Sequence, residues 1–221
     1  MATSLWHVLR EIVLETSSRK PSSATPILHV PAVLPSGLTI GAPSKENGFD
    51  VEGLAVSGNR VFVGLRGPVL RGWAIVLELR VKSEEDGRIS LEQTGEDSAP
   101  YLKHFLRLDG LGIRDLVIDG DDILALAGPT MDLDGPVYVY RWPMALKLGR
   151  TSLSFRQELA RIIRVPFFDG SDHAEGMTCV NANPLQILLC YDTPRNDQSP
   201  GSRVVASGRG VIVDIFDAHH R

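Results

Sequence analysis

Short apolar runs separated by turn residues fill the chain from about residue 50 to residue 217. The runs are rich in Val, Ile, Leu and Tyr, and Gly, Asn, Asp or Pro stands between them. That pattern is typical of strands joined by tight turns. No apolar run reaches the ~18 residues that a membrane-spanning helix needs. The sequence therefore predicts an all-β protein with no membrane partner.

Three of these runs begin alike, which indicates an internal repeat. The similar segments are 51–56 (VEGLAV), 113–118 (IRDLVI) and 174–179 (AEGMTC), and an Asn-Gly or Asp-Gly pair precedes each one. A tight turn, a second apolar run, a Pro-bearing loop and a third run follow in each case. Such turns need residues that tolerate positive φ. Each unit is therefore expected to form three or four antiparallel strands.

The fold that this repeat predicts is propeller-like. The units span about 44–100, 101–165 and 166–217 within a domain of residues 26–221, and polarity rises toward the end of each unit, as in a propeller blade. Three blades cannot close a ring, because propellers carry four to eight. We therefore expect a partial propeller, completed by another chain or by a part missing from this one. A β-sandwich or open sheet built from the same units is the alternative.

Two segments and the N-terminus suggest minor helical content. YLKHFLRL (101–108) and SFRQELARIIRV (154–165) have partial helical periodicity, so short helices and long loops are both open there. Residues 1–25 are expected to form an amphipathic helix followed by a Ser/Pro-rich linker. This first segment has charges within its apolar pattern, which a signal peptide does not.

Composition narrows the class of protein further. The net charge is −4, so nucleic acid is not an expected partner. The two cysteines, Cys179 and Cys190, lie on consecutive predicted strands and could face each other across a hairpin. Reduced thiols in a cytoplasmic protein are the favoured interpretation.

Carboxylates and arginines should gather at one end of the units. The start of a first strand and the end of the second strand lie at the same end of an antiparallel pair. We expect that end to bind a ligand. The candidate ligand-binding residues are Lys45, Glu46, Asp50, Glu52, Arg66, Arg71, Arg114, Asp115 and Arg195.

Two functions fit these residue types. Arginines bind phosphate or carboxylate groups, so an anionic small molecule or a protein partner is the first expectation. The alternative is a Ca²⁺- or Mg²⁺-dependent phosphoesterase with Glu52, Asp115 and Glu175 as metal ligands. In that case His173 or Glu175 would be the catalytic acid or base. The two Glu-Gly pairs could instead be structural, with Gly permitting close backbone approach. No P-loop, nucleophile elbow, H-E-x-x-H or dinucleotide motif is present.

The motifs also carry a family resemblance. SKENGFDVEGLAV, GLRGPVLRGWA, HFLRLDGLGIRDL, LAGPTMDLDGP and DHAEGM resemble a bacterial family known mainly as a domain of unknown function, over about residues 40–217. The chain looks like the C-terminal part of such proteins, and the resemblance implies no activity. A weaker resemblance, through DVEGL at 50–54 and HAEGM at 173–177, links the units to esterase-like phytase and SdiA-regulated propellers.

Overall fold

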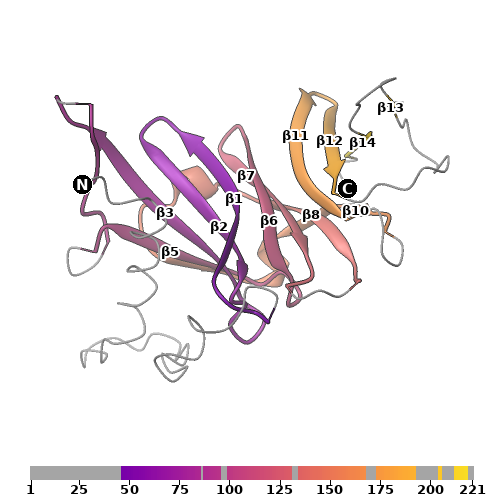
Figure 1. Ribbon diagram of the computed structural model, residues 1–221, viewed down its shortest axis with the longest axis horizontal. Coiled ribbons are helices and arrows are strands. Elements are labelled where there is room, and N and C mark those ends of the chain that lie inside the picture. Colours follow the sequence, from indigo (N-terminus) through magenta and orange to yellow (C-terminus); the bar gives the residue numbers. More distant parts are fainter. Residues whose placement is uncertain are drawn as a thin grey trace.

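The computed structural model describes residues 46–85, 87–95, 99–130, 134–167, 173–192, 204–205 and 212–218 (Figure 1). The expected helix and linker of residues 1–25 lie outside these ranges. Within them the protein is all-β, as predicted, and its helical content is limited to two 3₁₀ turns, η2 (Ala145–Lys147) and η3 (Arg156–Glu158). The strands are β1 (Asp50–Ser57), β2 (Arg60–Gly67), β3 (Ala74–Ser83), β4 (Ile89–Leu91), β5 (Tyr101–Leu106), β6 (Gly112–Asp119), β7 (Asp122–Gly128), β8 (Val137–Trp142), β9 (Ser152–Ser154), β10 (Ala160–Val165), β11 (Ala174–Ala182), β12 (Leu185–Tyr191), β13 (Val204–Val205) and β14 (Ile212–Asp217).

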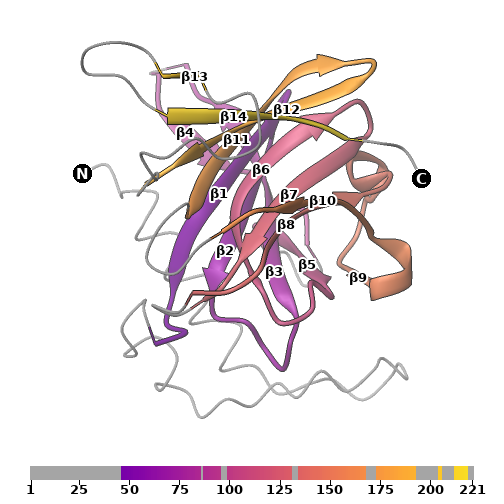
Figure 2. The ribbon, with the colours of Figure 1, turned by 90° about the vertical axis from the view of Figure 1, so that its right-hand side faces the viewer.

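The strands form three separate sheets that lie in series. The first sheet has the order β1-β2-β3-β5-β9, with β4 paired to β3. The second has the order β10-β8-β7-β6, and the third has the order β11-β12-β14-β13. Figure 2 looks onto the third sheet, with the second sheet behind it. Each sheet contains one of the repeated segments as its edge strand, and β6 contacts both β1 and β11.

The turns after the first two repeated segments adopt the backbone conformation that the sequence predicted, and so do residues that precede those segments. Asn47 and Asp109, which precede β1 and β6, have φ values of 60° and 57°. Gly58 and Gly120, in the turns after these strands, have φ values of 61° and 63°. Residues without a Cβ atom, or with a short polar side chain, adopt this left-handed region most readily.

The segments expected to be helices or long loops contain strands instead. YLKHFL forms β5, which pairs with β3 in the first sheet, although the repeat assigned it to the second unit. ARIIRV forms β10, which pairs with β8. The period-two pattern of β5 was hidden because His104, a polar residue, is fully buried beside Leu102 and Leu106.

Apolar side chains fill both spaces between neighbouring sheets. Phe62 and Val76 of the first sheet share a cluster with Ile123 and Trp142 of the second. A second cluster joins the other face of the second sheet to the third sheet. Its members include Leu124, Leu126, Val139, Ile187 and Leu189. Since both faces of the second sheet are buried, its central strand β7 is apolar along almost its whole length.

Glycines bring the first two sheets close together. A Cβ atom at Gly53 would lie 2.9 Å from the Cγ2 atom of Ile113, and one at Gly64 would overlap the same methyl group. Glycine in a strand often marks such a close approach. The structural interpretation of the glycine in DVEGL, on β1, therefore holds at this position.

Candidate functional site

Antiparallel pairing brings the predicted site residues to one end of the sheets. Asp50 pairs with Gly67 in the first sheet, and Gly112 pairs with Gly128 in the second. In the third sheet Ala174 pairs with Tyr191. First strands therefore begin where second strands end. At this end five charged residues, which we call the rim cluster, interact with one another: Asp50, Glu52, Arg66, Arg114 and Glu175.

Two arginines organise the rim cluster. Arg66, at the end of β2, donates from Nη1 to Oε1 of Glu52 at 2.7 Å and lies 3.6 Å from Oδ2 of Asp50. Arg114, on β6, forms an ion pair with Glu175 on β11 and donates to the carbonyl oxygen of Pro129. The Arg114 side chain is 7% exposed and that of Glu175 is 35% exposed, so this ion pair ties the second sheet to the third with its carboxylate partly open to solvent.

The repeat explains why these residues meet. Glu52, Arg114 and Glu175 occupy the same position in the three first strands, one residue after the start of the repeated segment. Since β6 lies between β1 and β11, the arginine stands between two carboxylates. The second unit departed from the Glu-Gly pattern, and that departure supplies the central positive charge.

Burial raises the pKa of Glu52, and the negative charge of Glu175 acts in the same direction. The hydrogen bond and the charge of Arg66, together with the charge of Arg114, act against this rise without cancelling it. The proton affinity of Glu52 is therefore higher than that of a free carboxyl group, because desolvation disfavours its charged form.

Three polar atoms of the rim cluster have no hydrogen-bond partner among the described residues. They are Oε2 of Glu52, Nε of Arg66 and Nε of Arg114, and each is buried. Buried polar groups in native proteins are nearly always satisfied by protein or by water. These atoms therefore set the rim cluster apart from an ordinary surface ion pair.

Both carboxylate oxygens of Asp115 accept backbone hydrogen bonds, which is not the environment expected of a metal ligand. Its Oδ1 accepts from the backbone N–H of Leu116 at 2.8 Å, and its Oδ2 accepts from the N–H of Met177 on β11 at 2.7 Å. Burial raises the pKa of Asp115 although both hydrogen bonds lower it. Asp115 thus joins two first strands. Among the residues that the structure describes, no three His, Cys, Asp or Glu side chains lie close enough to hold a metal ion.

The remaining predicted residues lie apart from the rim cluster or outside the described ranges. His173 is joined through Nε2 to Oδ1 of Asp134 at 2.6 Å, and both side chains are about one-third exposed. Arg71 is exposed in the loop before β3, and its carbonyl oxygen accepts from Arg107. Glu46 is exposed. Lys45 and Arg195 fall outside the described residues.

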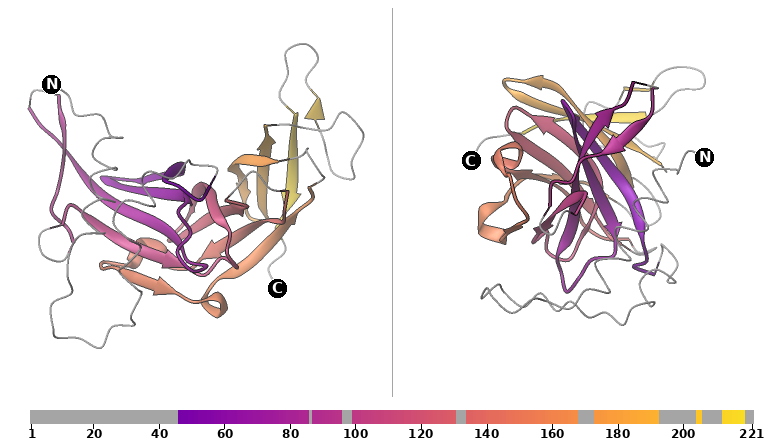
Figure 3. Two further views of the ribbon diagram at one scale, coloured as in Figure 1. Left: turned by 60° about the horizontal axis from the view of Figure 1, so that its bottom comes forward. Right: turned by 90° about the vertical axis from the view of Figure 1, so that its left-hand side faces the viewer.

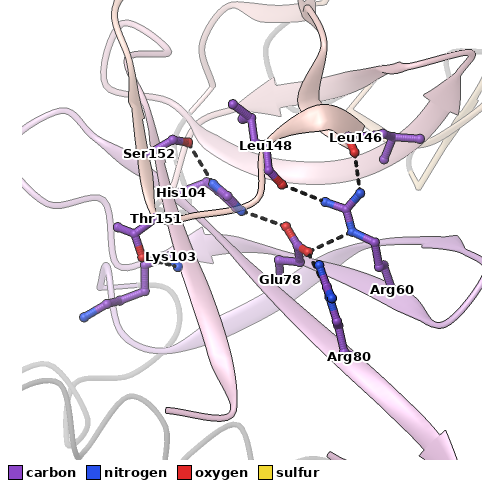
Figure 4. Close-up of polar contacts among 9 residues, drawn as sticks. All are labelled: Arg60, Glu78, Arg80, Lys103, His104, Leu146, Leu148, Thr151 and Ser152. Atoms are coloured by element: carbon purple, nitrogen blue, oxygen red, sulfur yellow. Dashed lines mark hydrogen bonds and ion pairs between the residues drawn. The ribbon is translucent and has the colours of Figure 1, made fainter. Parts of the chain in front are cut away.

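Sequence reasoning missed a buried polar network in the first sheet (Figure 4). Glu78, 1% exposed, accepts from Nε of Arg60 at 2.8 Å and is joined to Nε2 of His104 at 3.1 Å. Nδ1 of His104 lies 2.8 Å from Oγ of Ser152 on β9. The hydrogen bonds of His104 and Arg60 hold the pKa of Glu78 below its usual value, against the effect of burial. The available signal was the polar residue inside each apolar run, AIVLELRV and YLKHFL.

Arg60 also connects this network to the second unit. Its Nη1 and Nη2 atoms donate to the carbonyl oxygens of Leu146 and Leu148, in the segment between β8 and β9. Figure 4 shows this segment passing over β2 and β3. The network therefore holds the first two sheets together at the end opposite the rim cluster.

The cysteines do not face each other. Cys190 pairs with Gly176 and Cys179 pairs with Ile187, and both thiols are free. Both are half-buried, and burial raises the pKa of Cys179. The possible cross-hairpin contact is therefore wrong, and the free-thiol interpretation holds.

Comparison with known proteins gives a family and no activity. No helix in the described part of the chain is long and apolar enough to cross a membrane. No curated protein and no solved structure matches the sequence. One family model does match, over residues 24–207, and its description is "Protein of unknown function (DUF3616)". Since that match covers most of the 221 residues, the chain belongs to this family of proteins of unknown function.

Proposed function

We propose that the protein is a partial β-propeller that binds an anionic small molecule at the rim cluster. The observation that carries this proposal is the meeting of Arg66 and Arg114, from neighbouring sheets, beside the partly buried carboxylate of Glu52. Guanidinium groups recognise carboxylate and phosphate by paired charge-assisted hydrogen bonds. The three sheets in series, each with a repeated first strand at its edge, support the propeller interpretation.

Binding of an anion must overcome the carboxylates already present. Three of them, on Asp50, Glu52 and Glu175, face two arginines in the rim cluster. Burial raises the pKa of Glu52, so its protonation is easier than that of a free carboxyl group. We therefore expect anion binding to be accompanied by proton uptake at Glu52, which frees Arg66 for the ligand.

Titration calorimetry with sulfate tests the proposal, because the charge of sulfate is constant over the useful pH range. Arg66→Gln should weaken sulfate binding about tenfold or more, since a charge-assisted pair is worth roughly 1.5–3 kcal/mol. Arg150→Ala is the control, because Arg150 is exposed in the loop between η2 and β9. Equal sulfate affinity in the wild type and Arg66→Gln would contradict the proposal.

A metal-dependent phosphoesterase stays a prediction of the sequence. Its expected ligands are Glu52, Asp115 and Glu175, and no group of three possible ligands is found in the described residues. A rise in melting temperature with Ca²⁺ or Mg²⁺, followed by turnover of a generic phosphate ester, would support it. Neither observation is needed for the anion-binding proposal.

A further inference from the structure

The contact between the first and second sheets and the contact between the second and third sheets are made by equivalent faces. The first sheet presents Phe62 and Gly64 to the second sheet, and the second presents Leu124 and Leu126 to the third. We call this side of each sheet the leading face, and the opposite side the trailing face. Individual residues of the three sheets can be compared, because the first two strands of each sheet pair at equivalent positions. These pairs are Gly53–Gly64, Asp115–Leu126 and Gly176–Cys190.

The leading face of the third sheet is only partly covered. Leu188 corresponds to Phe62 and Leu124, which are fully buried, yet Leu188 itself is half-buried. Val213 corresponds to Val76 and Val139 through the pairs Cys190–Val213, Gly64–Val76 and Leu126–Val139. Val76 and Val139 are fully buried, whereas Val213 is half-buried. This face consists of Gly176, Thr178, Leu188, Cys190, Val213 and Ile215.

On the trailing face of the first sheet, the apolar side chains of β1 are exposed although their counterparts in the other two sheets are buried. Leu54 corresponds to Leu116 and Met177, which are 2% and 8% exposed because each packs toward the preceding sheet. Leu54 is 53% exposed, and Val56, two residues further along the same side, is 57% exposed. Figure 3 shows β1 and β11 on either side of β6, in the first and third of the three sheets.

The rest of the trailing face of the first sheet is already buried. Val63, Leu65, Leu77 and Leu79 form a separate apolar cluster there and are at most 2% exposed. A partner of the first sheet would therefore make its contact at β1, with Leu54 and Val56. Exposed apolar side chains at positions that are otherwise buried indicate an interaction surface.

We propose that a second copy of this chain packs the leading face of its third sheet against the exposed side of β1. The contact repeats the one between the first two sheets, where Leu116 packs on Gly53. A Cβ atom at Gly53 would lie 3.1 Å from Cγ of Leu116. By the same correspondence, Leu54 of one copy packs on Gly176 of the other. Glycine stands at both first-strand positions, whereas the neighbouring second-strand residue is Gly64 in the first sheet and Cys190 in the third. The Sγ atom of Cys190 lies 2.7 Å from where a Cβ atom of Gly176 would be, so Leu54 would pack against Cys190 as well.

Two such contacts related by a twofold axis close the assembly. Three sheets from each copy place six around one axis, which is within the four to eight of known propellers. The end faces of both copies are then covered, and no open apolar face is left to recruit further copies. The assembly depends on the packing of the sheets and not on an anion at the rim cluster.

Sedimentation velocity of the full chain tests the proposal. The sedimentation of the wild type should be measured over a concentration range on the order of a hundredfold, because the dimer fraction depends on concentration by mass action. The dimer should be the main species at the upper end of that range. Leu54→Asp and Thr178→Glu should each sediment as a monomer, with an unchanged far-ultraviolet circular dichroism spectrum. Ile89→Asp is the control: Ile89 is 73% exposed on β4, away from both surfaces, and this variant should remain a dimer.

Mixing the two variants tests whether the third sheet of one copy contacts β1 of the other, as opposed to contacts between two identical surfaces. A pair made of one Leu54→Asp copy and one Thr178→Glu copy keeps one of its two contacts free of substitutions, so an equimolar mixture should regain dimer. A wild type that is monomeric at every concentration would overturn the proposal. So would Leu54→Asp that stays dimeric, or a mixture that stays monomeric while the wild type dimerises.

Discussion

Oδ2 of Asp115 accepts the backbone N–H of Met177 at 2.7 Å, and this hydrogen bond joins the first strand of the second sheet to that of the third. The other oxygen of Asp115 accepts from Leu116 in its own strand. In the other two units the corresponding residue is glycine, Gly53 or Gly176. The second unit therefore has a carboxylate at the position where the other two units have no side chain.

Asp115→Ala should lower the free energy of unfolding by about 2 kcal/mol. The substitution leaves two N–H groups without their acceptor, at roughly 1–3 kcal/mol each, while removal of a partly buried charge offsets part of that cost. Urea unfolding measures the difference. Asp121→Ala is the control, because the exposed Asp121 carboxylate pairs with the exposed Lys147 ammonium group and its loss should change stability by less than about 1 kcal/mol. Equal effects would contradict the assigned role of Asp115.

Gly64→Ala should destabilise the protein through overpacking. The new methyl group would overlap Cγ2 of Ile113 in the next sheet, and the expected loss is about 1–3 kcal/mol. Gly149→Ala is the matched control, since no atom lies within 4 Å of the added group there. If thermal unfolding of Gly64→Ala matched that of the wild type, the two sheets would not be as close as the structure has them.

Glu78→Gln should cost about 3 kcal/mol near neutral pH, because it removes one partner of a buried ion pair and leaves Arg60 uncompensated. The pKa of Glu78 is lowered in the folded state, so the stability that its charge contributes is present above its ordinary value of 4.5. That contribution is lost as the pH falls through the folded-state pKa.

The difference in unfolding free energy between the wild type and Glu78→Gln should therefore narrow below pH 4.5. Denaturant unfolding at a series of pH values measures it. Glu85→Gln, at an exposed position between β3 and β4, serves as the control and should follow the wild type. A difference that stayed constant down to about pH 3 would mean that Glu78 is not ionised in the native protein.

Sulfate should bind more tightly as the pH falls toward the pKa of Glu52, which burial raises above 4.5. Protonation neutralises the carboxylate that pairs with Arg66, so the sulfate affinity should be higher at about pH 5 than at about pH 7. Glu52→Gln should bind sulfate tightly at both pH values, because its side chain is neutral throughout. Calorimetry at constant ionic strength measures this, and a Glu52→Gln variant with the same pH dependence as the wild type would contradict the role of Glu52.

The repeat made several features of the fold predictable. Segments at 51–56, 113–118 and 174–179 became the edge strands β1, β6 and β11, and the turn glycines after the first two, Gly58 and Gly120, adopted the expected positive φ values. The outer strands were not predictable in the same way. β5 pairs with β3 in the first sheet although the repeat assigned it to the second unit, and β10 pairs with β8 where a helix or a long loop was expected. Burial of His104 broke the alternation that would have revealed β5.

Part of the candidate site was also predictable. Antiparallel pairing alone brings Glu52 and Arg66 together, since both lie at the same end of one hairpin. The separate environments of Asp115 and His173 could not be foreseen, because their partners Met177 and Asp134 come from other hairpins. Contacts of that kind depend on how the sheets are placed against one another.

The sequence by itself determined the strand class, the threefold repeat and the end of the sheets at which charges collect, because these depend on local periodicity, turn geometry and strand direction. Only the tertiary structure decided that Arg114 pairs with Glu175, because that pair crosses a sheet boundary. It also decided that Glu78 and His104 are buried together and that Leu54 is exposed where Leu116 is not. Those outcomes depend on which faces of the sheets pack together. The strands have similar apolar patterns, so the sequence of one strand does not specify which face it packs against.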